Sequence, residues 1–170
     1  MNRFLKVLAI AVLLVTVAAA GAVLYGMTMF EPRVESVSVV VTPAEEAQTV
    51  FDAAVSQVRL STFAGRQFSA ADELAVSDCA FLTYTVRLRN RGFFPAEWIM
   101  LEVEPQQSAD GSARDVLQLA DERAHVLGAN SQGDLSATIL RTGDTGDTAR
   151  TLRIVCYVFG RKVETTVLAQ

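Results

Sequence analysis

Residues 80–89 read AFLTYTVRLR, a run in which apolar and polar side chains largely alternate. The positions on one side of the alternation are all apolar: Ala80, Leu82, Tyr84, Val86 and Leu88. A repeat of two residues is typical of a β-strand with one buried face. The run therefore predicts a half-buried strand, which ends at the turn Asn90-Arg91-Gly92.

The same alternation returns several times after this strand. Further strands are predicted over 99–104, 115–119, 124–127, 135–139, 152–159 and 163–167. Gly160-Arg161 fits a two-residue hairpin loop with glycine at its first central position. About seven or eight short strands with frequent turn signals describe an antiparallel β-sandwich, and roughly 140 residues are enough for its core. The predicted fold class is therefore mainly β.

The region before residue 80 adds a strand and a helix. Residues 34–41 are rich in valine and predict the first strand. Thr42-Pro43-Ala44-Glu45 has the form of a capping box, and apolar residues follow it at helical spacing. We therefore expect one amphipathic helix over about 43–58, inserted after the first strand, where it covers one face or end of the sheet. Residues 60–78 are expected to form a packed loop with a short helical turn at 69–72.

The N-terminal segment from Val7 to Phe30 contains no ionisable side chain apart from Tyr25. A helix of this length reaches roughly 36 Å, which is enough to cross a hydrocarbon core of about 30 Å. Because Arg3 and Lys6 precede the segment, the positive-inside rule predicts an N-terminus in the cytoplasm. This hypothesis divides the chain into a cytoplasmic N-terminus (1–6), a transmembrane segment in the cell membrane (7–30) and an extracytoplasmic domain (31–170).

A cleaved signal peptide is the alternative interpretation of the same segment. Ala18-Ala19-Ala20 resembles the small-residue site at which such peptides are cut. However, the apolar run continues to Phe30, so cleavage at Ala20 would leave an apolar tail on a soluble protein. The length of the run favours a retained signal-anchor.

The stretch Tyr84-Thr85-Val86-Arg87-Leu88-Arg89-Asn90-Arg91-Gly92 resembles the strand and turn of exported, membrane-anchored bacterial immunoglobulin-like modules. The resemblance covers about nine residues closely and the later strand rhythm loosely. It implies an immunoglobulin-like β-sandwich, a fold that serves many unrelated roles. The chain departs from the pattern by placing the 43–58 helix and the 60–78 loop between its first two strands.

Two cysteines, Cys79 and Cys156, fall in separate predicted strands. Outside the cytoplasm such a pair commonly forms a disulfide, and with Trp98 between them the order resembles the Cys…Trp…Cys order of immunoglobulin domains. The alternative is two separate buried thiols, since free cysteine is often simply packed in a core. We expect the disulfide and keep the second interpretation open.

Phe93, Phe94 and Trp98 surround Pro95 at the connection between two predicted strands. Aromatic residues in such a place either plug the end of the sandwich or form an exposed contact for a partner. Large aromatic side chains usually serve packing, so the plug is favoured and the contact surface is the alternative.

The chain offers few signs of catalysis or of a cofactor. It has 15 basic and 19 acidic residues, a net charge of -4, which argues against nucleic-acid binding. His125 is the only histidine, and Glu102 and Glu104 fit the solvated side of a strand. The acidic loop 142–148 invites a calcium interpretation, but it lacks the EF-hand spacing, so a flexible hairpin loop is favoured. We expect no enzyme, no metal and no cofactor.

These observations lead to a first hypothesis and an alternative. The first is a non-enzymatic, single-pass envelope protein whose outer β-sandwich binds another envelope protein. The alternative is a secreted or tethered module that binds a small ligand or a carbohydrate.

Overall fold

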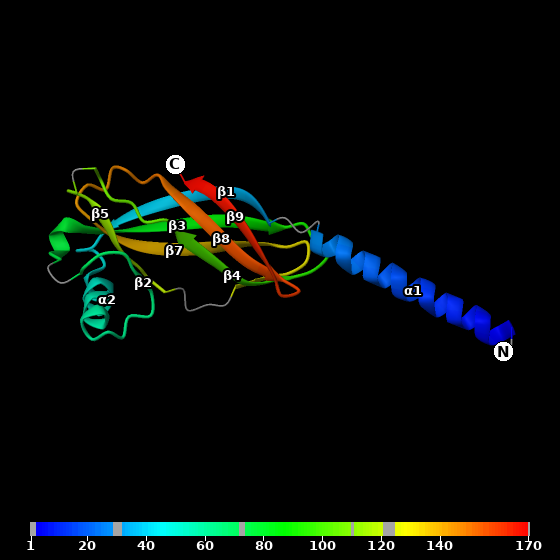
Figure 1. Cartoon of the computed structure of the whole chain (residues 1–170). Helices are drawn as coiled ribbons and strands as arrows, with labels where there is room; N and C mark the ends of the chain where they lie inside the picture. The colour runs from blue at the N-terminus through cyan, green and yellow to red at the C-terminus, as the bar shows by residue number, and fades with distance from the viewer. Residues whose placement is uncertain (1–2, 29–31, 72–73, 110, 121–124, 170) are drawn as a thin grey trace.

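The structure, a computed structural model, describes residues 3–28, 32–71, 74–109, 111–120 and 125–169. A long helix, α1, projects from one end of a β-domain, and a short helix, α2, lies near the opposite end (Figure 1). The elements in chain order are α1 (Arg3–Thr28), β1 (Pro32–Pro43), α2 (Gln48–Arg59), β2 (Arg66–Gln67), the 3-10 helix η1 (Val76–Asp78), β3 (Cys79–Asn90), β4 (Ala96–Val103), β5 (Arg114–Gln118), β6 (His125–Leu127), β7 (Gln132–Thr142), β8 (Arg150–Val158) and β9 (Arg161–Ala169).

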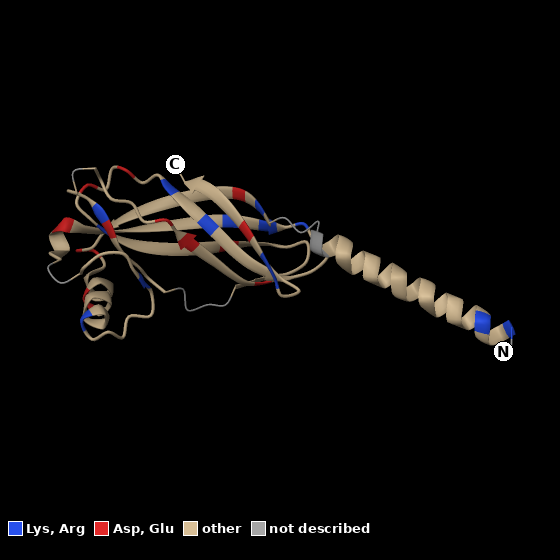
Figure 2. Ribbon diagram, viewed as in Figure 1, with Lys and Arg blue, Asp and Glu red and all other residues tan. Residues whose placement is uncertain are grey.

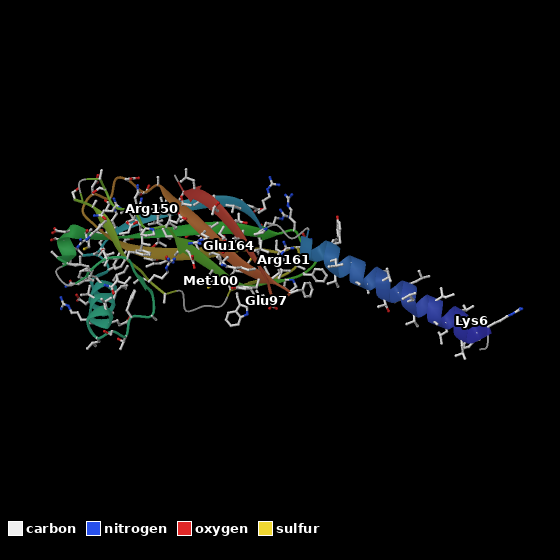
Figure 3. The ribbon with its side chains drawn as sticks, viewed as in Figure 1. Lys6, Glu97, Met100, Arg150, Arg161 and Glu164 are labelled. Carbon is white, nitrogen blue, oxygen red and sulfur yellow. The ribbon has the colours of Figure 1, made fainter. Side chains whose placement is uncertain are left out.

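Helix α1 is apolar on all sides and makes little contact with the β-domain. Figure 2 shows its basic residues at the N-terminal end alone, and Figure 3 labels Lys6 there. The stretch Arg3–Gly26 has a mean hydropathy of 2.8 in its most apolar window, none of which is buried. By length and composition it is able to cross a membrane, although a signal sequence would pass the same test. Met29 and Phe30, the last residues of the predicted 7–30 segment, lie outside the described residues.

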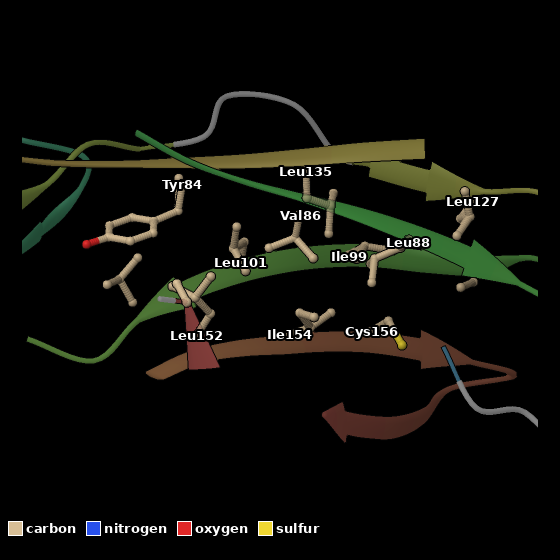
Figure 4. Close-up of a cluster of buried hydrophobic side chains, with 14 of the residues drawn as sticks. Tyr84, Val86, Leu88, Ile99, Leu101, Leu127, Leu135, Leu152, Ile154 and Cys156 are labelled. Carbon is tan, nitrogen blue, oxygen red and sulfur yellow. The ribbon is translucent and has the colours of Figure 1, made fainter. Parts of the chain in front are cut away.

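The strands form two antiparallel sheets, as the alternation predicted. The first sheet has the order β1-β3-β7-β5-β2 and the second the order β6-β4-β8-β9. Their facing sides share one apolar core, shown in Figure 4. The fold class, mainly β and antiparallel, is therefore confirmed.

Strand β3 lies between β1 and β7 in the first sheet. Leu82, Tyr84, Val86 and Leu88, which the sequence placed on one side of a strand, are at most 1% exposed and lie in the shared core. Phe81, on the opposite side of β3, belongs instead to a second cluster beneath α2. The first half of β3 is therefore buried on both faces, whereas Arg87 and Arg89 in its second half are exposed.

Helix α2 covers the outer face of the first sheet with Phe51, Ala54 and Val55. It begins at Gln48, five residues later than the predicted start at 43. The reason is that Pro43 pairs with Ala80 and the amide of Ala44 donates to the carbonyl of Cys79. Strand pairing therefore continues through the supposed capping box, and a turn over 44–47 leads into the helix.

Two further expectations about loops are wrong in detail. The hairpin between β8 and β9 turns at Phe159-Gly160, one residue earlier than predicted, because Val158 pairs with Arg161. The 60–78 region contains the short β2, which pairs with β5, and η1, while no helix forms at 69–71. Position 72 lies outside the described residues.

The two cysteines are free and buried, which corrects the expected disulfide. Cys79 lies in the cluster beneath α2, whereas Cys156 lies in the shared core, close to Leu88 in Figure 4. Leu88 comes nine residues after Cys79 along β3, a separation of about 30 Å. A disulfide requires Cα atoms within about 7 Å of each other, so the alternative of two separate buried thiols describes the chain.

We predict that a thiol reagent at pH 8 leaves both cysteines of the folded chain unmodified. Burial raises the pKa of each thiol to about 11, so the reactive thiolate is scarce as well as shielded. Unfolding in denaturant without reductant should then expose two thiols per chain. Recovery of no free thiol after unfolding would show that the bond forms after all.

We also predict that the β-domain loses stability as the pH rises from about 9 to about 12. Burial raises the pKa of Tyr84 to about 12, and the two thiols are shifted to about 11. The folded chain therefore keeps protons that the unfolded chain releases at lower pH, and the free energy of unfolding falls through this range. Urea titrations at stepwise pH would measure the slope, and Tyr84→Phe should flatten it above pH 10.

Candidate functional site

The candidate site is the end of the β-domain that faces α1, called here the proximal end. Strand register brings three connections together there, because Pro32 pairs with Asn90 and Ala96 pairs with Leu127. These are the β3–β4 loop (91–95), the β6–β7 loop (128–131) and the β8–β9 turn at Phe159-Gly160. The opposite end, which carries α2, is called the distal end (Figure 1).

Asn90 holds the loops of the proximal end in place. Its side chain is fully buried, and its Nδ2 donates to the carbonyl oxygens of Phe94 (2.8 Å) and Gly128 (2.9 Å). Its Oδ1 accepts a hydrogen bond from the amide of Gly92 at 2.8 Å. Because both the Nδ2 and the Oδ1 of this buried side chain are hydrogen-bonded, Asn90 fixes the β3–β4 and β6–β7 loops relative to the end of β3.

Phe94 joins the β-domain to helix α1. Its ring packs edge-on against Phe159, with ring centroids 4.5 Å apart and an interplanar angle of 72°. The ring also lies against Gly26 of α1, where an added Cβ would come within 2.1 Å of its Cε2 atom. Only glycine leaves room for this contact, so Phe94 occupies the junction between the helix and the domain.

The other aromatic side chains of the proximal end are exposed to solvent. Phe93 is 82% exposed, Trp98 64% and Phe159 56%. The structure thus separates the residues that the sequence grouped, because Phe94 packs at the junction while Phe93 and Trp98 project outward. It also adds Phe159, which sequence reasoning missed, although a large aromatic beside glycine in a hairpin was a visible signal.

Two of these exposed aromatics adopt a left-handed backbone conformation. Trp98 and Phe159 both have φ of +50°, a region that costs an L-residue about 1–2 kcal/mol. At Trp98 the register slips against both neighbouring strands, between Ala96 and Ile99 and between Glu97 and Met100. A bulge of this kind re-aims a side chain, and here it turns Trp98 away from the core position that the immunoglobulin order would give it.

Charged side chains flank the aromatic ones. Arg161 and Glu97 are exposed at the proximal end (Figure 3), and Glu97 precedes Trp98 in the chain. Arg91, in the β3–β4 loop, is exposed as well. The proximal end therefore combines exposed rings with both signs of charge.

A second candidate, at the distal end, is a buried ionic cluster of Asp115, Arg141 and Arg150. Asp115 Oδ1 accepts hydrogen bonds from Arg141 Nη1 (2.9 Å) and Arg150 Nη2 (3.1 Å), and its Oδ2 accepts one from Arg150 Nε (2.9 Å). All three residues are at most 3% exposed. Because β5 and β7 belong to one sheet and β8 to the other, the cluster ties the two sheets together.

The same arginines hold the acidic loop 142–148. Arg141 Nε donates to the carbonyl of Asp144 at 2.7 Å, and Arg150 Nη1 donates to that of Asp147 at 3.2 Å. Asp144 Oδ1 accepts the backbone amide of Gly146, and Asp147 Oδ1 accepts that of Ala149, so one oxygen of each carboxylate is engaged by the local backbone. Among the described residues, no group of three or more His, Cys, Asp or Glu side chains is placed to hold a metal ion. The loop connects β7 of the first sheet to β8 of the second, so it is not the hairpin loop that the sequence suggested.

The remaining sequence candidates lie on the strands. His125 is half-buried in β6 opposite Ile99. Glu102 pairs with Arg66 (3.4 Å) and Arg153 (3.3 Å) on the outer side of β4, and Glu104 is exposed. Glu102 is therefore engaged by two arginines while Glu104 faces solvent, and these contacts do not pair the two carboxylates for acid–base catalysis.

We predict that Asp115→Asn strongly destabilises the β-domain, by about 3–5 kcal/mol, because it leaves two buried guanidinium groups without their carboxylate. Urea unfolding of the full chain in detergent would measure the loss. The matched control is Asp134→Asn, which removes an equally well-formed pair with Arg87 (2.8 and 2.9 Å) at an exposed site. The control should shift the unfolding midpoint far less, and equal losses would contradict the clamping role of Asp115.

Comparison with known proteins gives no guide to the function of the chain. No protein-family model matches the chain, and no curated protein matches its sequence. The function is therefore inferred from the position and chemistry of the chain's own residues.

Proposed function

We propose that the protein is a single-pass membrane protein of the cell envelope, anchored by α1, whose β-domain is a non-enzymatic interaction module outside the membrane. The observation that carries the proposal is the exposure of α1, which presents apolar side chains to solvent on every side. A helix of this kind in a soluble protein would bury a stripe of its surface, whereas a lipid bilayer covers all of it.

The apolar residues after Ala20 support a retained helix. A cut after Ala20 would leave the last turns of α1 attached to the β-domain as an exposed apolar stub. Leu24, which is 63% exposed, lies in that stub. The contact between Gly26 and Phe94 is present with or without such a cut, so the exposed stub is the observation that favours a retained α1.

The distribution of charge supports an orientation with the β-domain outside. Arg3 and Lys6 lie at the free end of α1 (Figure 2), and basic residues flanking an apolar helix favour the cytoplasmic side. Residues 1–6 would then be cytoplasmic and the β-domain extracytoplasmic.

The strand order supports an immunoglobulin-like fold for the β-domain. In the first sheet the order β1-β3-β7-β5 corresponds to strands A-B-E-D of an immunoglobulin domain, and β4-β8-β9 in the second corresponds to C-F-G. The chain adds α2 and β2 to this plan between the first two main strands, and β6 at the edge of the second sheet.

An interaction role fits the way the buried polar groups are used. The buried polar side chains hydrogen-bond to neighbouring loops or strands, so they stabilise the fold. These residues are Asn90, Asp115, Gln118, Arg141 and Arg150. With α1 in a membrane, α2 and the distal loops face away from the bilayer (Figure 1). We propose that a partner protein of the envelope binds there.

The alternative, a small-ligand or carbohydrate module, has one observation in its favour. A groove of about 240 Å³ lies between β2 and β4 and is lined by Arg66, Met100 and Glu102 among others. Arg66 and Glu102, two charged residues that line the groove, form an ion pair with each other. A polar ligand in the groove would therefore have to compete with this pair.

We predict that the full-length chain, tagged at its C-terminus, sediments with membranes and loses the tag when intact cells are treated with protease. Leu14→Arg combined with Val15→Arg should lower the fraction of the chain that sediments with membranes, because each arginine at mid-bilayer costs about 2.5–3.5 kcal/mol on insertion. Leu14→Ile is the matched control and should leave the distribution unchanged. A tag protected inside intact cells would overturn the orientation, and a mature chain beginning near Gly21 would overturn the anchor.

A further inference from the structure

We propose that Phe93, Trp98 and Phe159 insert into the outer interface of the lipid bilayer and hold the proximal end of the β-domain against the membrane. This proposal rests on the proposed function, since it requires α1 to cross that bilayer. It replaces the hypothesis of a protein contact at Phe93 and Trp98 with a lipid contact.

The length of α1 places the proximal end at the membrane surface. A transmembrane helix needs about 20 residues to cross a hydrocarbon core of about 30 Å. Counted from Lys6, the last charged residue before the span, that distance ends near Gly26. Gly26 is the residue against which Phe94 packs, so the junction lies where the helix leaves the hydrocarbon.

The exposed rings lie close to that junction. Phe93 precedes Phe94 in the chain, and Phe159 packs edge-on against Phe94 with a centroid distance of 4.5 Å. Trp98 follows four residues after Phe94, beside Glu97, which pairs with Tyr157 near the β8–β9 turn. Phe93 and Phe159 therefore come from the two connections next to the junction with α1, and Trp98 comes from the start of β4.

Aromatic side chains favour the membrane–water interface. Tryptophan is enriched there because its apolar body leaves water while its indole N–H stays hydrated. Phenylalanine has no polar atom, but its apolar ring can enter the boundary between headgroups and acyl chains. In water the same rings remain 56–82% exposed, and an exposed group of large apolar side chains marks a contact surface.

The backbone at Trp98 and Phe159 adds an independent observation. A two-residue hairpin with positive φ at both positions favours Asn-Gly, yet the chain places Phe159 before Gly160, with φ values of +50° and +73°. Trp98 carries the same +50° in a bulge. A left-handed backbone costs free energy, and here it directs two aromatic side chains into solvent. Such strain indicates that the exposed side chains have a function.

The charges of the proximal end are compatible with a lipid surface. Without Arg3 and Lys6, the chain has 13 basic (15 − 2) and 19 acidic residues, and this net charge of −6 is repelled by anionic headgroups. At the proximal end itself, the exposed Arg91 and Arg161 add positive charge close to the rings, and the exposed Glu97 adds negative charge. The rings and arginines together fit an interface with both zwitterionic and anionic lipid.

The chain's only tryptophan, Trp98, provides a direct probe of this contact. The full-length chain is reconstituted into vesicles of phosphatidylcholine with one part in five of phosphatidylglycerol, with or without brominated acyl chains. We expect brominated lipid to lower the Trp98 emission about twofold, as for a ring at the interface, and iodide in the buffer to quench it weakly.

The matched control moves the tryptophan to the distal end. Trp98→Phe combined with Leu168→Trp places an indole at another exposed position, since Leu168 is 55% exposed next to the pair formed by Arg150 and Ala169. Brominated lipid should leave its emission nearly unchanged. In the original chain, Phe93→Ser with Phe159→Asn should reduce the quenching of Trp98.

Flotation of the vesicles separates the two proposals. Chains that float and show quenched Trp98 support both of them. Chains that float with Trp98 unquenched by brominated lipid and open to iodide overturn the lipid contact and leave the anchor intact. Chains that fail to float overturn the anchor, and the lipid contact with it.

Discussion

The apolar surface of α1 is the constraint on which the rest of the molecule depends. More than ten large apolar side chains of this helix are exposed, from Phe4 to Tyr25. At about 1.5–3 kcal/mol for each side chain removed from water, their transfer into lipid is worth on the order of 20 kcal/mol. That exceeds the whole stability of a typical domain, about 5–15 kcal/mol. If α1 is the proposed membrane anchor, the bilayer determines where the chain resides, and the β-domain determines which surface is presented there.

The β-domain is organised between two ends that β3 connects. At the proximal end, Asn90 fixes the loops and Phe94 receives α1 against Gly26. At the distal end, Asp115 joins arginines from both sheets and thereby fixes the loop 142–148. Between the two ends the core is apolar. Polar interactions thus determine the geometry of the loops, whereas burial of apolar area supplies the cohesion of the sheets.

The strands were predictable from the sequence because their pattern is local. Alternation over 80–89 identified the buried face of β3, and similar runs identified the other main strands. The start of α2 was not predictable from the sequence. The capping pattern at Thr42 competes with the pairing of β1 and β3, which forms only in the folded chain. The sequence also failed to predict the state of the cysteines, because Cys79 and Cys156 lie in different clusters of the folded chain.

The candidate site was predictable only in part. The sequence drew attention to Phe93, Phe94 and Trp98, but it gave no sign that Phe94 would pack on α1 or that a bulge would expose Trp98. The ionic cluster left no trace in the sequence either, because Asp115 and its two arginines are 26 and 35 residues apart along the chain. Contacts of this range depend on topology, which local periodicity does not encode.

If α1 stays attached and lies in the membrane, the uncleaved protein must remain with the lipid. The intact mass of the protein recovered from membranes washed with alkaline carbonate tests this. We expect the uncleaved chain of 18.4 kDa in the washed membranes. A species shortened by the N-terminal apolar segment, or a full-length chain released into the wash, would contradict it.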